Sequence, residues 1–481
     1  MNRLHRSQAI SVAVCALTVV ALSALWRRHP IDDAYITYRY ALNLIQGSGF
    51  VYNSGEWVLG TTTPLWGLIL AAIAALGADL EVASIVGGAL SMAASIALFL
   101  AVVPQGVSLA LLAVWGALIA AYYPLSVVTF SGMETPLYSL VVGMGLFLFG
   151  AERYALGGLC AALATLLRPD GFLVIVAGLA AAGRRKSAPA LRSLIPYIAV
   201  VLPCAGLALY LYGSFVPHSV EAKRLLYASS PLTNALMFFE ALSQEPIDAV
   251  LLCVGGAGLI LLGRERKYRP FAIWAGVYSL GIIASGVRPI FFWYFGPLWL
   301  LFATFGVEGL RRMVQEQSIL IPRLVIPALC VLVTTLDIVK RAPGLDAVEL
   351  RENGYREVVS QYGRAIAPGS KVLLGEIGIL GYGLMQARVI DSAGIVSPEV
   401  SQIVRENRSR LAPYADVVRE APWFRQMVER LSPDWIVGAR DRMAITQAEN
   451  EDWFAKRFTR RAVVAQDQLG GIGVYERAPQ P

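Results

Sequence analysis

Residues 32–66 read DDAYITYRYALNLIQGSGFVYNSGEWVLGTTTPLW and are the most informative stretch of the sequence. Two adjacent carboxylates, Asp32 and Asp33, open a short, tyrosine-rich helical run that stops at Gly47–Gly49. Such a run is typical of a helix that lies in a membrane interface. The structural interpretation makes Asp32 an N-cap and Asp33 a favourable first-turn charge. The functional alternative is that a carboxylate at the rim of a bilayer acts as a base or holds a divalent cation.

The sequence around this stretch is strongly apolar. Hydrophobic residues make up 56% of the 481 residues and charged residues 16%, with a mean hydropathy of +0.57. Soluble domains carry about 25% charged residues. About half of the charged side chains lie from Arg341 onward, whereas the first 340 residues are repeated apolar blocks of membrane-spanning length. We therefore expect a mainly α-helical, polytopic membrane domain over 1–340, followed by a soluble tail over 341–481.

The net charge of +7 does not indicate a nucleic-acid partner. Its basic clusters, Arg184–Lys186, Arg264–Arg269 and Arg311–Arg312, stand at the ends of apolar blocks, which is the positive-inside pattern of membrane proteins. The five cysteines all lie within apolar blocks, so they form neither a disulfide framework nor a zinc-binding spacing. The partner that the composition predicts is the lipid bilayer.

Eleven apolar blocks are candidate membrane spans. They are 8–26, 63–77, 82–103, 107–125, 136–150, 155–183, 192–212, 246–263, 270–286, 291–309 and 320–338. With a cytoplasmic N-terminus and an uncleaved first span, this odd number places the basic clusters inside and the tail outside. Long outer segments then cover 27–62 and roughly 213–245.

The block 155–183 leaves the span count open. Its centre, Arg168–Gly171, contains a proline and a glycine, and such breaks are tolerated only where they are buried or line a cavity. The block is either one long span or two half-helices. If it crosses twice, one neighbouring span is miscounted.

The tail alternates between helical and strand-like patterns. Asp346–Ile366 has helical periodicity. Short strands are expected at Lys371–Gly375, Arg388–Asp391, Trp435–Gly438 and Gly473–Tyr475. We therefore expect an α/β domain. The spacing of Gly375, Gly378 and Gly381 does not match a nucleotide-binding loop.

Several charged residues lie within or between the apolar blocks. Arg168 and Asp170 stand inside one block, where an ionisable group costs about 2.5–3.5 kcal/mol on insertion scales, so they are either a structural pair or functional. Glu134 stands between two blocks, on the side that the span count makes the inner one. It either caps a helix or takes part in catalysis, and in the second case the span count is wrong by one.

The outer segments supply further candidates, each with a structural alternative. Lys223 is a candidate ligand for an anion or a solvated loop charge. Arg288 precedes an aromatic run that ends at Tyr294 and is otherwise an interface anchor in an aromatic belt. Arg39, one turn after Tyr35, is oriented toward an anion or anchors lipid headgroups.

Carboxylates are the only candidates for a metal site. His218 is the only histidine beyond the first 30 residues, so no histidine-based metal site can form. Glu56 is either a second carboxylate in the outer segment or a turn residue. A cation held by Asp32, Asp33 or Glu56 would be a hard ion, with magnesium, manganese and calcium as the candidates.

The stretch 32–66 resembles the first outer loop of the GT-C glycosyltransferases, and is most similar to the mycobacterial terminal arabinofuranosyltransferases and their bacterial relatives. The motifs shared within it are Asp32-Asp33, Tyr38-Arg39-Tyr40, Gly47-Ser48-Gly49, Asn53-Ser54-Gly55-Glu56 and Thr63-Pro64-Leu65-Trp66. Further matching segments are Ser131–Thr135, Arg168–Gly171, Val216–His218 with Lys223, Gly378–Tyr382 and Val389–Gly394. The chain departs from these relatives at His218, where they often have asparagine, and at Thr61–Thr63, where they have Tyr-Thr-Asn.

The resemblance implies an integral membrane enzyme of the bacterial plasma membrane. It would move one sugar, with arabinofuranose as the candidate, from a polyprenyl-phosphate donor to a cell-envelope glycan on the extracytoplasmic face. Asp33, with Asp32 beside it, would be the base or the metal holder. Cations would bind the donor phosphate and stabilise its developing charge. The candidates are Lys223, Arg288, Arg39 and Arg168.

Two other functions compete with this one. The first is a lipid-linked sugar transporter or flippase, which would also contain intramembrane charges and a broken helix. No internal repeat relates two halves of the sequence, and the long outer segment and tail suit an enzyme better. The second is a noncatalytic membrane assembly factor on the same fold, because a fold alone does not fix function.

Overall fold

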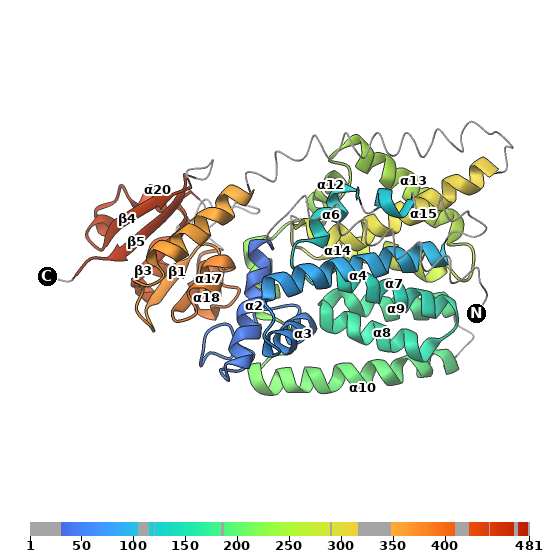
Figure 1. Ribbon diagram of the computed structural model, residues 1–481, viewed down its shortest axis with the longest axis horizontal. Coiled ribbons are helices and arrows are strands. Elements are labelled where there is room, and N and C mark those ends of the chain that lie inside the picture. Colours follow the sequence, from blue (N-terminus) through green and yellow to red (C-terminus); the bar gives the residue numbers. More distant parts are fainter. Residues whose placement is uncertain are drawn as a thin grey trace.

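The computed structural model describes residues 30–103, 115–119, 121–183, 187–288, 291–315, 348–408, 423–441, 443–465 and 470–479. Long helices run side by side in the part before residue 316, and the tail stands beside one end of them (Figure 1). The candidate spans 8–26 and 320–338 lie outside the described residues.

The first outer segment forms two short helices at one end of the helical part. The helices concerned are α2 (Asp32–Ile45), α3 (Pro64–Ala75) and α4 (Leu80–Val102). α2 lies between the long helices and the tail (Figure 1). α3 starts beside α2, because the hydroxyls of Thr37 and Thr63 are 3.3 Å apart. It leads into α4, where Ser84 hydrogen-bonds to Tyr38 of α2. The start of α3 and the first turns of α4 therefore both lie beside α2, which does not agree with the predicted crossing at 63–77.

The block 155–183 is a helical hairpin. It contains α8 (Tyr154–Leu167), the 3-10 turn η1 (Pro169–Phe172) and α9 (Leu173–Ala182). In the neighbouring helix over 135–150, Gly145 packs against both Cys160 and Val174. Further along the same helix, Phe149 packs against Gly178. α8 and α9 thus run in opposite directions. Of the two alternatives left open for this block, the structure therefore has the two half-helices.

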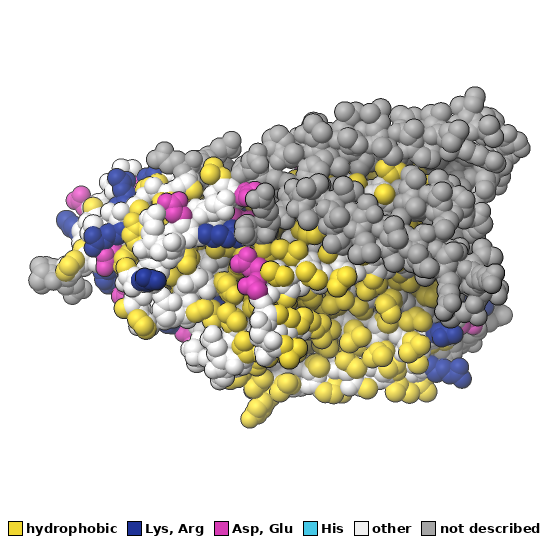
Figure 2. All heavy atoms as spheres, in the orientation of Figure 1, with side chains coloured by type: hydrophobic (Ala, Val, Ile, Leu, Met, Phe, Trp, Pro, Cys, Tyr) yellow, Lys and Arg dark blue, Asp and Glu magenta, His cyan; other side chains and the backbone are white. Residues whose placement is uncertain are grey.

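Most of the other helices of this part match predicted apolar blocks, but the two helices between residues 218 and 241 lie in the predicted outer segment 213–245, and the helix over 123–129 lies mostly after the block 107–125. These other helices are α6 (Tyr123–Thr129), α7 (Thr135–Gly150), α10 (Ser187–Tyr212), α11 (His218–Leu226), α12 (Pro231–Ala241), α13 (Pro246–Leu262), α14 (Arg269–Ala284), the 3-10 turn η2 (Phe292–Phe295) and α15 (Gly296–Gln315). Among the described helices, α4 and residues 190–212 of α10 are each long and apolar enough to cross a membrane. α12 and α13, bent by 107°, meet the same criterion as a pair. Apolar side chains dominate the visible face of this part, whereas charges gather on the tail (Figure 2).

α7 shows which residues lie at the two ends of the helical part. Before it, Ser131 accepts a hydrogen bond of 3.0 Å from the backbone N–H of Ile31, next to α2. At its other end, Gly150 touches the backbone of Lys267. We call these the α2 end and the basic end. Glu134 precedes α7 and therefore lies at the α2 end, together with the segment that contains α2, whereas the span count placed these two on opposite sides of the membrane.

The tail contains a five-stranded sheet of order β2-β1-β3-β5-β4. Its strands are β1 (Lys371–Leu374), β2 (Arg388–Asp391), β3 (Trp435–Ala439), β4 (Phe458–Val464) and β5 (Ile472–Arg477). β1 pairs in parallel with β2 and β3, and β5 pairs antiparallel with β3 and β4. The four predicted strands are confirmed. β4 was not predicted, because it is an edge strand with exposed charged side chains and little apolar alternation.

Helices cover this sheet and connect it to α2. They are a helix over 348–362, α17 (Ile379–Gly383), α18 (Pro398–Arg408), α19 (Trp423–Leu431), α20 (Ile445–Ala448) and α21 (Asp452–Ala455). The helix predicted from Asp346 is confirmed over the described 348–362. α17 follows the carboxyl end of β1 and packs against α2, so the loop between β1 and α17 faces the Asp32-Asp33 pair.

Candidate active site

Arg39 joins α2 to the tail. Its side chain is buried, with 1% of the residue exposed. Its guanidinium donates to the carbonyl oxygens of Tyr52, Gly381, Leu384 and Ala387 and to Oδ1 of Asn53. A guanidinium has five N–H donors, and five acceptors surround this one. Arg39 therefore occupies the interface with the tail and not the phosphate site predicted for it.

Asp32 also faces the tail. Its carboxylate accepts hydrogen bonds from the backbone N–H groups of Gly378, at 3.2 Å, and Ile379, at 2.8 Å. Its own backbone N–H donates to Glu352 at 3.1 Å. Burial, together with the negative charges of Asp33 and Glu352, raises the pKa of Asp32 to about 7, although the two amides act in the opposite direction. The contacts of Asp32 are thus made with the tail backbone.

Asp33 lies near a cation of the helical part. The ammonium of Lys223, on α11, is 3.3 Å from the hydroxyl oxygen of Tyr294 and 4.5 Å from the ring centre of Phe291. Burial lowers the pKa of Lys223, but Tyr294 and the negative charge of Asp33 more than offset this, so that the pKa lies above its ordinary value. Lys223 is therefore a charged ammonium close to a carboxylate and against aromatic rings.

Arg288 approaches the same region through the backbone. Its N–H donates to the carbonyl oxygen of Tyr227 at 2.9 Å, and Ala228 forms an antiparallel bridge with Val287. Tyr227 directly follows α11, the helix that carries Lys223. The structure thus brings two of the predicted phosphate-binding cations to neighbouring segments, although they are 65 residues apart in the sequence.

Arg168 is paired with carboxylates. Its guanidinium lies 3.3 Å from Glu134 and 3.2 Å from Asp170. It also stacks over the rings of Tyr138, at 5.2 Å, and Tyr294, at 4.6 Å. The structural pair considered for Arg168 and Asp170 is therefore present and is extended by Glu134. Through the Tyr294 ring, this cluster supports the aromatic wall on which Lys223 rests.

Glu56 and His218 take part in contacts with the tail. The Glu56 carboxylate pairs with Arg388 and accepts a hydrogen bond from Asn53 at 2.9 Å. Nε2 of His218 lies 3.2 Å from Oγ of Ser401, and burial lowers the pKa of the imidazole despite the nearby Glu221. Both side chains therefore join the tail to the helical part, away from the contacts of Lys223.

The whole chain is similar in structure to solved membrane transferases. It matches ArnT from Cupriavidus metallidurans in the apo state with 14% identity and a TM-score of 0.59, over 98% of both chains. It matches the oligosaccharyltransferase AglB from Archaeoglobus fulgidus with 13% identity and a TM-score of 0.58, over 98% of this chain and 74% of that one. The chain has the GT-C fold. The fold resemblance inferred from residues 32–66 is thereby confirmed.

The other comparisons are less informative. The family model described as "Domain of unknown function (DUF8728)" matches residues 348–473, which is most of the tail. A comparison with curated proteins finds no match. The mycobacterial arabinofuranosyltransferase AftD is matched with 13% identity over 98% of this chain and 40% of that one, and its TM-score of 0.47 carries no argument about the sugar.

Within this GT-C fold, two of the three predicted metal ligands, Asp32 and Glu56, have other partners. Among the described residues, no three His, Cys, Asp or Glu side chains form a group that could hold a metal ion. Both carboxylate oxygens of Asp32 accept backbone N–H groups, and Glu56 is paired with Arg388. We therefore assign no step of the chemistry to a metal.

The tail side of the interface was missed by the sequence analysis. Tyr52 donates a hydrogen bond to the carbonyl oxygen of Ile377, and a side chain at Gly381 would begin 1.7 Å from the Tyr52 hydroxyl. Gly378 is equally close to Asp32. The sequence signal for this interface was the repeat of Gly375, Gly378 and Gly381, which does not match a nucleotide-binding loop. Glycines also mark places where two backbones approach closely.

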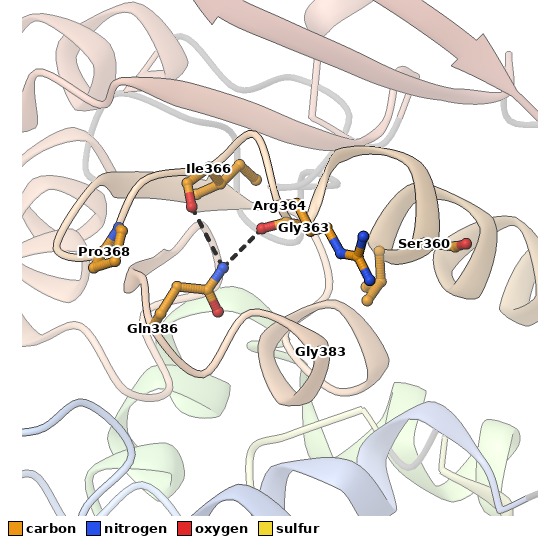
Figure 3. Close-up of a pocket in the computed structure, with 8 residues that line it drawn as sticks. Ser360, Gly363, Arg364, Ile366, Pro368, Gly383 and Gln386 are labelled. Carbon is orange, nitrogen blue, oxygen red and sulfur yellow. Dashed lines mark hydrogen bonds between the residues drawn. The ribbon is translucent and has the colours of Figure 1, made fainter.

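The tail also has an open groove of about 630 Å³. Its lining residues are Val359, Ser360, Gly363, Arg364, Ile366, Pro368, Gly383 and Gln386 (Figure 3). The amide of Gln386 donates to the carbonyl oxygens of Gly363, at 2.9 Å, and Ile366, at 3.4 Å. These bonds tie the groove wall together, and none of the predicted site residues lines it.

Proposed function

We propose that the chain is a polyprenyl-phosphate-dependent glycosyltransferase that moves one sugar to a hydroxyl of a cell-envelope glycan. The observation that carries this proposal is that a carboxylate, Asp33, lies within electrostatic range of the half-buried Lys223, whose ammonium rests against aromatic rings, at the α2 end of a GT-C fold. The basic end carries Arg266 and Arg312, so the positive-inside rule assigns the α2 end to the extracytoplasmic face of a bacterial plasma membrane.

The chemistry needs a base and a stabilised leaving group. When the acceptor hydroxyl attacks the anomeric carbon, the bond between that carbon and the phosphate oxygen breaks, and the acceptor proton passes to the Asp33 carboxylate. Negative charge develops on the departing polyprenyl phosphate. Lys223, with Arg288 on the neighbouring segment, binds this phosphate and stabilises its charge in a site with aromatic walls.

The ligands of the structural neighbours support this donor class. One ArnT structure was solved with undecaprenyl phosphate, and it matches this chain with a TM-score of 0.53. The AglB structure contains a dolichol-phosphate and an inhibitory peptide. Both lipids end in one phosphate group, which suits two cations at the rim of a membrane. Arabinofuranose as the sugar and a glycan as the acceptor rest on the resemblance of residues 32–66.

Transfer by the purified protein tests this proposal. Full-length protein in nanodiscs would be incubated with a panel of short polyprenyl-phosphate sugars and mixed glycan acceptors, and the products identified by mass spectrometry. We expect a glycosylated acceptor from one donor. No product from any donor, with correctly folded protein, would contradict the transferase. A parallel reaction with a chelator measures directly whether transfer needs a cation.

Replacing Lys223 should weaken the binding of the donor. For Lys223→Ala we expect a donor KM about 10- to 100-fold higher, because a charge-assisted hydrogen bond to the phosphate is worth about 1.5–3 kcal/mol. The acceptor KM should stay unchanged. The matched control is Lys267→Ala, since Lys267 also rests on a tyrosine ring but lies at the basic end. Equal donor KM values for Lys223→Ala and wild type would remove Lys223 from the phosphate site.

A further inference from the structure

Asp32 and Asp33 are neighbours in sequence but have different surroundings. The negative charge of Asp33 acts on the ammonium of Lys223, in the helical part. Asp32 binds two consecutive backbone N–H groups of the tail, those of Gly378 and Ile379. Because both residues open α2, whatever holds Asp32 also fixes the first turn of the helix that carries Asp33.

We propose that Asp32 is a positioning residue, which ties the start of α2 to the loop between β1 and α17 of the tail and so holds Asp33 in place. The tail is then part of the catalytic unit. The identity of the positioned step rests on the glycosyltransferase function proposed above, whereas the tie between α2 and the tail does not.

Gly378 is the tail residue on which this contact depends. A Cβ atom there would lie 1.8 Å from the carbonyl oxygen of Asp32 and 2.5 Å from its carboxyl carbon. The φ angle of Gly378 is −73°, outside the left-handed region, so an added methyl group acts through its contact with Asp32. Only glycine lets the tail backbone come close enough to donate both hydrogen bonds.

Other contacts extend the same interface along α2 and the segment after it. Arg39 binds three tail carbonyl oxygens, and the side chain of Asn53 exchanges two hydrogen bonds with the backbone of Val389. These contacts hold the body of the helix, while Asp32 holds its first turn. The backbone N–H of Asp32 keeps its bond to Glu352, so losing the contact of the Asp32 carboxylate loosens the turn that carries Asp33 and leaves the tail docked.

The kinetic consequence differs from that of a donor-site residue. A misplacement of about 1 Å at a reacting group can lower a rate by about 10²-fold. Lys223 and Tyr294 belong to α11 and η2, which are not among the described contacts of Gly378. We therefore expect kcat to fall in variants of this contact while the donor KM stays at its wild-type value.

The test compares Asp32→Ala, Asp32→Asn and Gly378→Ala in the full-length protein. We expect kcat to fall by about 10²-fold in Asp32→Ala and Gly378→Ala, and by less in Asp32→Asn, which keeps one oxygen that can accept the Ile379 N–H. Gly276→Ala is the matched control, because its added methyl group meets open space. Wild-type kcat in both Asp32→Ala and Gly378→Ala would overturn the proposal.

A double-mutant cycle separates positioning from direct chemistry. If Asp32 acts through Gly378, the double variant Asp32→Ala with Gly378→Ala should have the same kcat as either single variant. Effects that multiply would show that Asp32 works independently of the tail and would overturn the proposal.

Hydrogen exchange gives a readout that does not depend on activity. Both single variants should speed amide exchange in the first turns of α2, and Gly276→Ala should not. Wild-type exchange rates in both variants would overturn the proposed tie. If no donor is used by the wild type but exchange changes as expected, the glycosyltransferase function fails and the tie between Asp32 and the tail stands.

Discussion

Asp33→Asn should lower the rate of sugar transfer by about 10²- to 10⁴-fold, the range expected when a general base is removed. Asparagine has nearly the shape of aspartate but cannot accept the proton of the acceptor hydroxyl. It also removes the negative charge that helps raise the pKa of Lys223. The rate would be measured as single-turnover transfer in nanodiscs, with saturating donor, so that a change in donor binding does not contribute.

The control for this variant is another acidic residue at the start of a helix. Asp79 is the N-cap of α4 and accepts a hydrogen bond from the backbone N–H of Val82 at 2.9 Å. Asparagine caps helices as well as aspartate does, so Asp79→Asn should transfer sugar like wild type. If Asp33→Asn also kept the wild-type rate, Asp33 would not be the base.

Arg39→Met should lower the free energy of unfolding by about 3–5 kcal/mol, because each buried acceptor left without its donor costs about 1–3 kcal/mol. Methionine retains much of the side-chain volume but donates no hydrogen bond. Three carbonyl oxygens of the tail, with those of Tyr52 and Asn53, would lose their common donor. Chemical unfolding in detergent and the rate at which protease releases the tail would both report the loss.

An exposed ion pair of the same interface provides the comparison. Arg405 of α18 pairs with Glu221 of α11, and its side chain is 57% exposed. Arg405→Ala should change stability by less than about 1 kcal/mol, since exposed pairs contribute little. Equal stabilities for Arg39→Met and Arg405→Ala would show that Arg39 does not hold the tail.

Apolar blocks predicted where the helices are, but not in which direction they run. The segment 63–77 is as apolar as a span, yet α3 is only 12 residues long, and the chain is beside α2 both where α3 starts and again early in α4. The block 155–183 has the length of one long helix, but Gly171 packs against the backbone of Ala164 and the chain turns back. Hydropathy records length and composition, whereas direction depends on contacts between distant segments.

The same limit explains which site residues could be predicted. Asp33 was singled out as a carboxylate next to an apolar segment and Lys223 through the GT-C resemblance, and the structure places them within electrostatic range of each other. Arg39 is also a charged residue close to an apolar segment, but three of its acceptors come from tail segments more than 340 residues away. No pattern in one sequence pairs those segments. The span count put Glu134 and the segment 27–62 on opposite sides for a related reason. Each counted span takes its direction from the spans before it, so one early error reverses every later side.

The position of α2 has a consequence for how this protein can be divided. By sequence α2 belongs to the membrane part, but its residues Asp32 and Arg39 bind the tail backbone at Gly378 and Gly381. A hybrid that joins this membrane part to a tail from another protein would therefore separate two halves of one interface. Such a hybrid would need residues 32–56 and 377–389 to be exchanged together. The two segments are far apart in the sequence but form one interface.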